Sequence, residues 1–168
     1  MAILDEALGF VPQSKLPSYS NFKVAADNTL KIYKYSPVLI SGGYCIIAEA
    51  TGGCAGIALN HVDAANGEIV DIPVCTDASQ VFRVKANVVG DITDVGKYVA
   101  IIAHTGNNDQ SDATVDMTNS TDTPTADTPF IVVGWDSNRV TDAAASADLF
   151  CLVRLAIPQF DMGLDTDT

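Results

Sequence analysis

The chain has 168 residues and a formal net charge of −12, and 48% of its residues are hydrophobic while only 18% are charged. This length favours one domain with its own core. The acidity argues against nucleic acid as a partner, because like charges repel. No run of about 18 apolar residues occurs, which argues against a membrane-spanning helix.

The N-terminal stretch MAILDEALGF carries Asp5 and Glu6 and no basic side chain, unlike a secretory signal. We therefore expect synthesis in a reducing cytoplasm, where disulfides are rare. Cys45 and Cys54 would lie about 16 Å apart along the predicted strands, whereas a disulfide requires Cα atoms within about 7 Å. The sequence thus predicts buried free thiols at Cys45, Cys54, Cys75 and Cys151.

Residues 1–37 are predicted to form an extended N-terminal arm that includes a first strand. Pro12, Pro17 and Pro37 keep most of the arm extended. Thr29–Tyr35 alternates and is predicted to be a strand near a sheet edge, since lysines blunt edges. The apolar groups of the arm need a surface to cover them, so the arm packs either on its own domain or on a neighbouring chain.

Residues 38–157 are predicted to form the core, a small all-β antiparallel sandwich or barrel. Short apolar runs alternate with turn signals such as Gly42-Gly43, and no run precedes a convincing helix. A hairpin is predicted between residues 44–50 and 54–59, through a three-residue loop. Later strands are predicted at 68–74, 81–89, 98–103, 129–135 and 149–157.

The cleanest alternation lies at Val81–Val89, where one face carries Phe82, Val84, Ala86 and Val88. Residues 104–129 break the strand pattern, because Asp, Asn, Ser and Thr dominate them. We expect a long polar surface loop inserted into the core there. Residues 158–168 are expected to form an acidic C-terminal tail.

The sequence offers little catalytic chemistry. His61 and His104 stand outside any metal-binding motif, and residues of this type are more often found in loops and at strand ends. The glycine-rich stretch 52–56 joins two predicted strands, whereas a phosphate-binding loop precedes a helix. The pattern therefore indicates a structural or binding module without a cofactor, and not an enzyme.

Three short motifs follow one another in the core: G-I-A at Gly56–Ala58, D-A-A-x-G-E at Asp63–Glu68 and V-D-I-P-V at Val70–Val74. Over residues 38–103, this order of strand, loop and strand resembles the small β domains of tailed-bacteriophage capsid decoration (cement) proteins, with 149–157 as a returning strand. The insertion at 104–129 departs from the pattern of that family.

The resemblance implies a structural virion protein that binds the outer surface of the expanded phage head and stabilises it by bridging neighbouring major capsid subunits. Its partners would be the major capsid protein and copies of itself, with a trimer favoured over a dimer. It would be made in the host cytoplasm and lie on the outer capsid surface, without a cofactor, nucleic acid or membrane.

Decoration proteins often reach across subunits with N-terminal arms, and this resemblance implies a partner-binding set on the arm. Lysines would pair with acids of the shell, and apolar side chains would bury against it. The candidate residues are Phe10, Val11, Lys15, Leu16, Tyr19, Phe22 and Lys23.

Two alternative functions stay open at this point. One is another virion component, such as a tail or fibre subunit. The other is a non-catalytic carbohydrate-binding β module, which usually presents a cluster of exposed aromatic rings. The single tryptophan, Trp135, ends a predicted core strand, which does not favour this second alternative.

Overall fold

The structure is a computed structural model that describes residues 9–25, 31–48, 53–63, 69–88, 91–102, 110–136 and 150–156. Over these residues the chain is all-β, as predicted, with eleven strands in two sheets and one 3₁₀ helix. In this part of the chain no helix is long and apolar enough to cross a membrane. The predicted tail at 158–168 and His104 lie outside the described residues.

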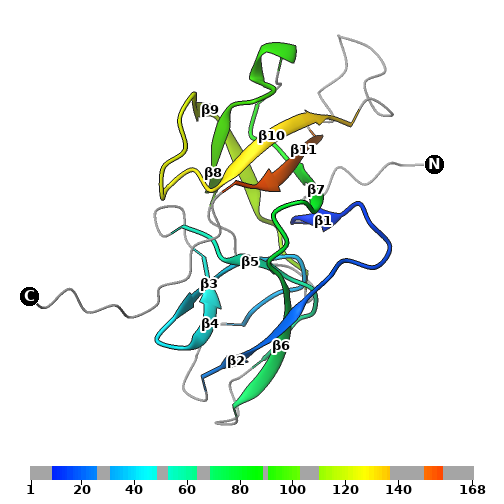
Figure 1. Cartoon of the computed structure of the whole chain (residues 1–168), viewed down its shortest axis with the longest axis vertical. Coiled ribbons are helices and arrows are strands. Elements are labelled where there is room, and N and C mark those ends of the chain that lie inside the picture. The colour runs from blue at the N-terminus through cyan, green and yellow to red at the C-terminus, as the bar shows by residue number, and fades with distance from the viewer. Residues whose placement is uncertain are drawn as a thin grey trace, which may run out of the picture.

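Five strands form a closed barrel in the lower half of Figure 1: β2 (Ser20–Val24), β3 (Pro37–Ser41), β4 (Tyr44–Ile47), β5 (Gly56–Ala58) and β6 (Val70–Cys75). Their order is β2-β4-β3-β5-β6. Strand β2 closes the barrel, because it pairs antiparallel with β6 and parallel with β4, where Lys23 lies opposite Tyr44. We call this part of the molecule the barrel lobe.

The second sheet lies in the upper half of Figure 1 and contains β1 (Val11–Pro12), β7 (Val81–Lys85), β8 (Tyr98–Ile102), β9 (Thr114–Thr121), β10 (Phe130–Trp135) and β11 (Phe150–Leu155). The strand order is β1-β7-β11-β10-β8-β9. The sheet curls, because Ala86 beyond β7 forms a parallel bridge with Val115 of β9. We call this part the sheet lobe.

Each lobe surrounds a cluster of buried side chains, and the two lobes share residues where they meet. The barrel cluster includes Val24 and Ile72, which are fully buried. The cluster of the sheet lobe includes Phe82 but also Ile57 and Cys75, which belong to barrel strands. These shared apolar contacts join the two lobes.

The structure confirms the predicted turn at Gly42-Gly43. Both glycines have positive φ, +55° and +84°, and they join β3 to β4 with Ser41 opposite Tyr44. Positive φ at both residues of a two-residue hairpin loop favours glycine, because a Cβ atom is unfavourable there. The strands predicted at 98–103, 129–135 and 149–157 are also confirmed, as β8, β10 and β11.

The alternation predicted at 81–89 is confirmed for its first part. Phe82, Val84 and Ala86 are buried, but β7 ends at Lys85 and Val88 is 39% exposed. The predicted hairpin between residues 44–50 and 54–59 is wrong. Strand β3 lies between β4 and β5 and pairs with both, so the two runs are neighbours in sequence but not in the barrel.

The loop predicted at 104–129 is also wrong in its central part, where β9 pairs antiparallel with β8. Ala113, Val115 and Met117 point into the core and are at most 5% exposed. Polar residues fill the alternate positions, which face outward, and they hide the strand in an average over the segment.

The strand predicted at Thr29–Tyr35 does not form over the part that the structure describes. Ile32 and Lys34 make only isolated bridges, with Val62 and Gln110. The first barrel strand is instead β2, inside the predicted arm. Residues 26–30 lie outside the described ranges.

Candidate partner-binding surface

The predicted arm is fixed at its start to the sheet lobe. The Phe10 amide donates a hydrogen bond to the Tyr35 carbonyl at 3.0 Å, and the Phe10 ring stacks on Phe130 with the ring centroids 4.5 Å apart. Phe10 is fully buried. Val11 pairs with Arg83 of β7, so this end of the arm is part of the sheet lobe.

The other end of the arm is part of the barrel. Val24 is fully buried, and Phe22 packs half-buried against the barrel cluster. Lys23 points outward and forms an ion pair with Asp71, with 2.7 Å between Nζ and Oδ1. Of the two arrangements that the sequence left open, packing on the same chain is found at both ends of this segment, in β1 and in β2.

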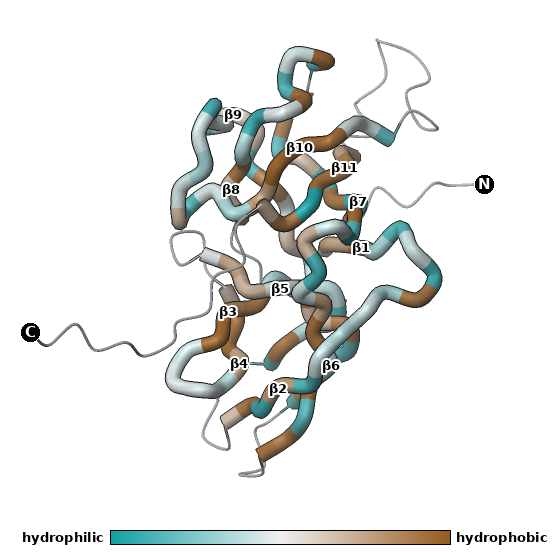
Figure 2. Tube along the Cα trace, in the orientation of Figure 1, coloured by the Kyte–Doolittle hydropathy of each residue, from teal (hydrophilic) through white to brown (hydrophobic). Residues whose placement is uncertain are grey.

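Between these anchors lies an exposed loop, residues 13–19, which we call the β1–β2 loop. Figure 1 shows it in blue, projecting from the side of the molecule. Leu16 is 92% exposed and Tyr19 61% exposed, and Lys15 is also exposed. Figure 2 shows a hydrophobic patch on this otherwise mainly hydrophilic loop. Burying a leucine side chain is favourable by about 1.5–3 kcal/mol, so a partner that covered Leu16 would gain free energy of this size.

Hydrogen bonds hold the two ends of the β1–β2 loop to the turn between β6 and β7 and to the first residue of β7. The Gln13 amide donates to the Val81 carbonyl at 2.9 Å, and the Ser18 hydroxyl donates to Asp77 at 3.2 Å. Hydrogen bonds from the Ser79 hydroxyl and amide, and then from Ser18, lower the pKa of Asp77. Asp77 is therefore ionised at neutral pH, which strengthens its bond to the loop.

The structure brings together three of the seven predicted site residues, Lys15, Leu16 and Tyr19, on the β1–β2 loop. Phe10 is fully buried in the sheet lobe and Phe22 is half-buried against the barrel cluster, so neither lies on this exposed loop and their contact with a partner stays a prediction. The two other predicted residues lie elsewhere, since Val11 is half-buried in β1 and Lys23 faces outward from the barrel.

A second exposed surface was missed by the sequence reasoning. We call it the barrel face, and it consists of outward side chains on and beside β4, β2 and β6. Tyr44, Ile46 and Ile69 are 37%, 36% and 55% exposed. The alternation of Tyr44 and Ile46 with buried Cys45 was the available signal. It was not decisive, because the sequence does not distinguish an apolar residue outside the barrel from one inside it. The barrel face comprises Lys23, Ala25, Tyr44, Ile46, Ile69 and Asp71.

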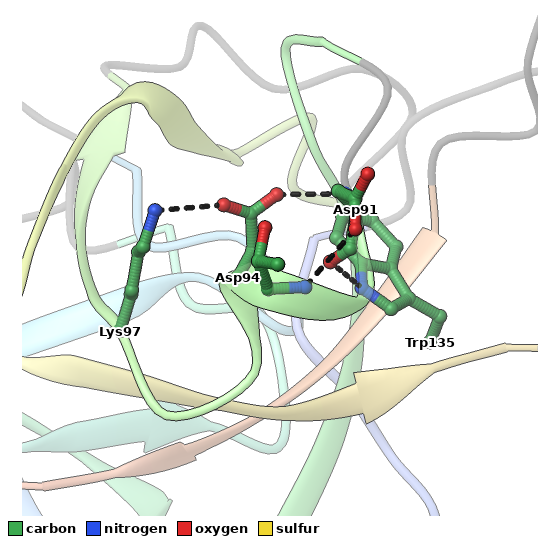
Figure 3. Close-up of polar contacts among 5 residues, drawn as sticks. Asp91, Asp94, Lys97 and Trp135 are labelled. Carbon is green, nitrogen blue, oxygen red and sulfur yellow. Dashed lines mark hydrogen bonds and ion pairs between the residues drawn. The ribbon is translucent and has the colours of Figure 1, made fainter.

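A third surface lies around the 3₁₀ helix η1 (Ile92–Asp94), where Ile92 is 78% exposed. Figure 3 shows the polar contacts that fix this turn. The Trp135 indole N–H donates to the Asp91 carbonyl at 3.1 Å, and Asp94 accepts from the Asp91 amide at 2.7 Å and pairs with Lys97 at 3.2 Å. The bond from the Asp91 amide is the main cause that lowers the pKa of Asp94. The Trp135 indole is half-buried, and its hydrogen bond ties it to this turn.

The described residues hold no group of three or more His, Cys, Asp or Glu side chains that could bind a metal ion. All four cysteines are buried and free, as predicted. Burial raises the pKa values of Cys45, Cys54 and Cys151 to about 12 and also raises that of Cys75. Thiols with such pKa values are poor nucleophiles at neutral pH, because the thiolate is the reactive form.

Comparisons of this chain with protein-family models, with curated proteins and with solved structures found no match.

Proposed function

We propose that this protein is a structural virion protein that binds the outer surface of the expanded phage head and stabilises it by bridging neighbouring major capsid subunits. The observation that carries the proposal is the exposed β1–β2 loop, which is anchored at one end in each lobe. The proposal is also supported by the motifs at 56–74, whose two strands, β5 and β6, pair antiparallel.

The β1–β2 loop has the chemistry of a small protein-binding knob. Leu16 and Tyr19 supply apolar area for a depression on the shell, and Lys15 supplies a charge for an acidic neighbour. Both ends of the loop are already held by strand pairing and hydrogen bonds, so binding needs little further ordering of the chain.

A single loop makes a small contact, and the repeated geometry of a shell compensates for this. When one copy contacts both the shell and a neighbouring copy, its second contact forms at a high effective concentration. The affinity of each single contact can therefore be low. The net charge of −12 keeps the remaining surface hydrated and limits self-aggregation.

In this proposal the protein is not an enzyme and needs no cofactor. It is made in the host cytoplasm, lies on the outer capsid surface, and contacts the major capsid protein and further copies of itself. Nucleic acid and membrane are not partners. The half-buried, hydrogen-bonded Trp135 gives no support to the alternative of a carbohydrate-binding module.

The proposal is tested by co-sedimentation of the purified chain with expanded, undecorated heads. A variant with Lys15→Ser, Leu16→Ser and Tyr19→Ser removes the loop chemistry and leaves both anchors in place. The matched control is Ile92→Ser, because Ile92 is a similarly exposed apolar residue on the sheet lobe.

We expect the unchanged chain and the control to sediment with the heads, and the loop variant to bind about 100-fold more weakly, as for loss of hot-spot residues. Failure of the unchanged, folded chain to bind would overturn the proposed function. A loop variant that binds as well as the control would move the contact away from the β1–β2 loop.

A further inference from the structure

The barrel face carries an apolar row and a charged row across three neighbouring strands. Lys23 of β2 lies opposite Tyr44 of β4 and also opposite Asp71 of β6, which places all three side chains in one row. Val24 lies opposite Val70, and β2 is parallel to β4. Extending these registers by one or two residues places Ala25 between Ile46 and Ile69 in the next outward row.

Among the residues of this face that the structure describes, the charges are balanced, unlike those of the chain as a whole. Lys23 and Asp71 form an exposed ion pair and cancel one another, while the protein has a net charge of −12. Two copies of such an acidic chain repel each other over most approaches, and a neutral, partly apolar face lowers that repulsion. The charge pattern therefore favours contact between copies at the barrel face.

We propose that the barrel face binds the barrel face of a second copy in a two-fold symmetric dimer. A two-fold axis that runs along the strands, between β2 and β6, places Lys23 of each copy opposite Asp71 of the other. The same axis places Ile69 of each copy against Ala25 of the other, with Tyr44 and Ile46 at the flanks. An isologous contact of this kind needs a self-complementary patch, and the Lys23–Asp71 pair supplies one.

This inference deepens the proposed function and rests on it for its biological role, in which copies of the chain contact one another on the shell. A two-fold contact differs from the trimer that the sequence favoured. It also uses a surface separate from the β1–β2 loop, so one copy can bind the shell and a second copy at the same time.

The size of the face indicates a weak contact. Three strands about 4.8 Å apart and about 17 Å long cover roughly 250 Å² of sheet. A standard stable interface buries about 800 Å² on each partner. We therefore expect a dimer that forms at about 100 µM and above in solution and that is strengthened when copies are held close together on a shell.

The test is a charge-swap experiment followed by sedimentation velocity at about 0.15 M salt, where the Debye length of about 8 Å limits long-range repulsion. Lys23→Glu and Asp71→Lys are prepared as two separate variants. Each variant alone places like charges across the proposed contact, and its dimerisation should weaken by about tenfold or more. An equimolar mixture of the two places opposite charges at both contacts and should regain the dimer.

Mixing cannot restore the ion pair within each chain, so recovery in the mixture reports only contact between copies. Ile69→Lys should abolish the dimer, while Leu16→Ser on the other surface should leave it unchanged. The inference is overturned by a monomer at all concentrations, by a trimer, or by a mixture that behaves like its two components. These outcomes concern free protein and leave the binding of heads, which tests the proposed function, as a separate result.

Discussion

Phe10 and Leu16 are apolar residues of the same predicted arm, and the fold gives them opposite environments. Phe10 is fully buried against Phe130, whereas Leu16 is 92% exposed on the β1–β2 loop. No regular apolar period in the arm separates the two residues. Which residue packs inside depends on strand pairing with β7, far along the chain.

This contrast gives a prediction for stability. Phe10→Ala should lower the free energy of unfolding by about 3–5 kcal/mol, since it removes a buried ring and leaves a cavity. Leu16→Ser should change it by less than about 0.5 kcal/mol, because the side chain is exposed. Urea unfolding followed by circular dichroism measures both. Equal effects for the two variants would show that Phe10 is not packed as described.

The buried thiols give a prediction for alkaline pH. Burial raises the pKa values of Cys45, Cys54 and Cys151 from 9.0 to about 12, so the folded chain keeps these protons at a pH where the unfolded chain loses them. Stability from this source is complete below pH 9.0 and is lost progressively between pH 9.0 and about 12.

Two measurements check the thiols. The midpoint of thermal unfolding should fall above pH 9, and it should fall less in a Cys45→Ala variant. In the native protein at pH 8, an alkylating reagent should label none of these three thiols, while the urea-unfolded chain should be labelled at all of them. Rapid labelling of the native chain would contradict their burial.

At the scale of elements, β9 contains a bulge whose residues are hydrogen-bonded to one carboxylate, that of Asp116. The register of β9 against β8 shifts between Asp116 and Thr121, and Asp116 organises the residues of this bulge. Its Oδ1 accepts from the Asn87 side chain at 2.8 Å and from the Thr118 amide at 3.0 Å, and its Oδ2 accepts from the Asn119 side chain at 2.7 Å. These bonds replace ladder pairing that the bulge removes.

Partial burial raises the pKa of Asp116, but the hydrogen bonds from Asn119, Asn87 and Thr118 outweigh this effect and hold the pKa below its usual value of 3.8. A lowered pKa stabilises the fold above the unfolded value and loses this effect as pH falls through the folded value. Asp116→Ala should therefore lower the free energy of unfolding by about 1 kcal/mol at pH 7. The difference from the parent should shrink below pH 3.8.

Urea unfolding at pH 7 and at pH 3 measures this difference, with Asp122→Ala as a control on an exposed acid of the following turn. If Asp116→Ala has the same effect at both pH values, the carboxylate does not stabilise the bulge through its charge.

The local pattern of each strand explains which elements the sequence predicts well. Strands β7, β8, β10 and β11 have mostly apolar stretches or a clean alternation bounded by turn residues, and their positions follow from local pattern. Strand β9 has its apolar residues, Ala113, Val115 and Met117, dispersed among Asp and Thr, so local averages predict a loop. The insertion of β3 between β4 and β5 depends on long-range pairing, which no local pattern records.

At the scale of the whole molecule, the arm joins the two lobes. Its first strand, β1, pairs in the sheet lobe, and its second, β2, closes the barrel by pairing with β4 and β6. Removal of residues 1–24 would therefore unfold both lobes and could not test the arm as a binding device. Point changes in the β1–β2 loop avoid this problem.

The candidate surface was predictable only in part. The sequence points to an arm with apolar and basic residues, and Lys15, Leu16 and Tyr19 remain exposed in the structure. The sequence does not separate them from Phe10, Phe22 and Lys23, because burial in each lobe is set by pairing with β6 and β7. It gives no indication of the barrel face, which exists only once β4, β2 and β6 lie side by side.

The most direct test of the proposed function is electron cryomicroscopy of expanded, undecorated heads incubated with the purified chain. We expect added density on the outer surface, where neighbouring major capsid subunits meet, with the β1–β2 loop facing the shell. Heads that remain bare, or density in which this loop faces solvent, would contradict this expectation.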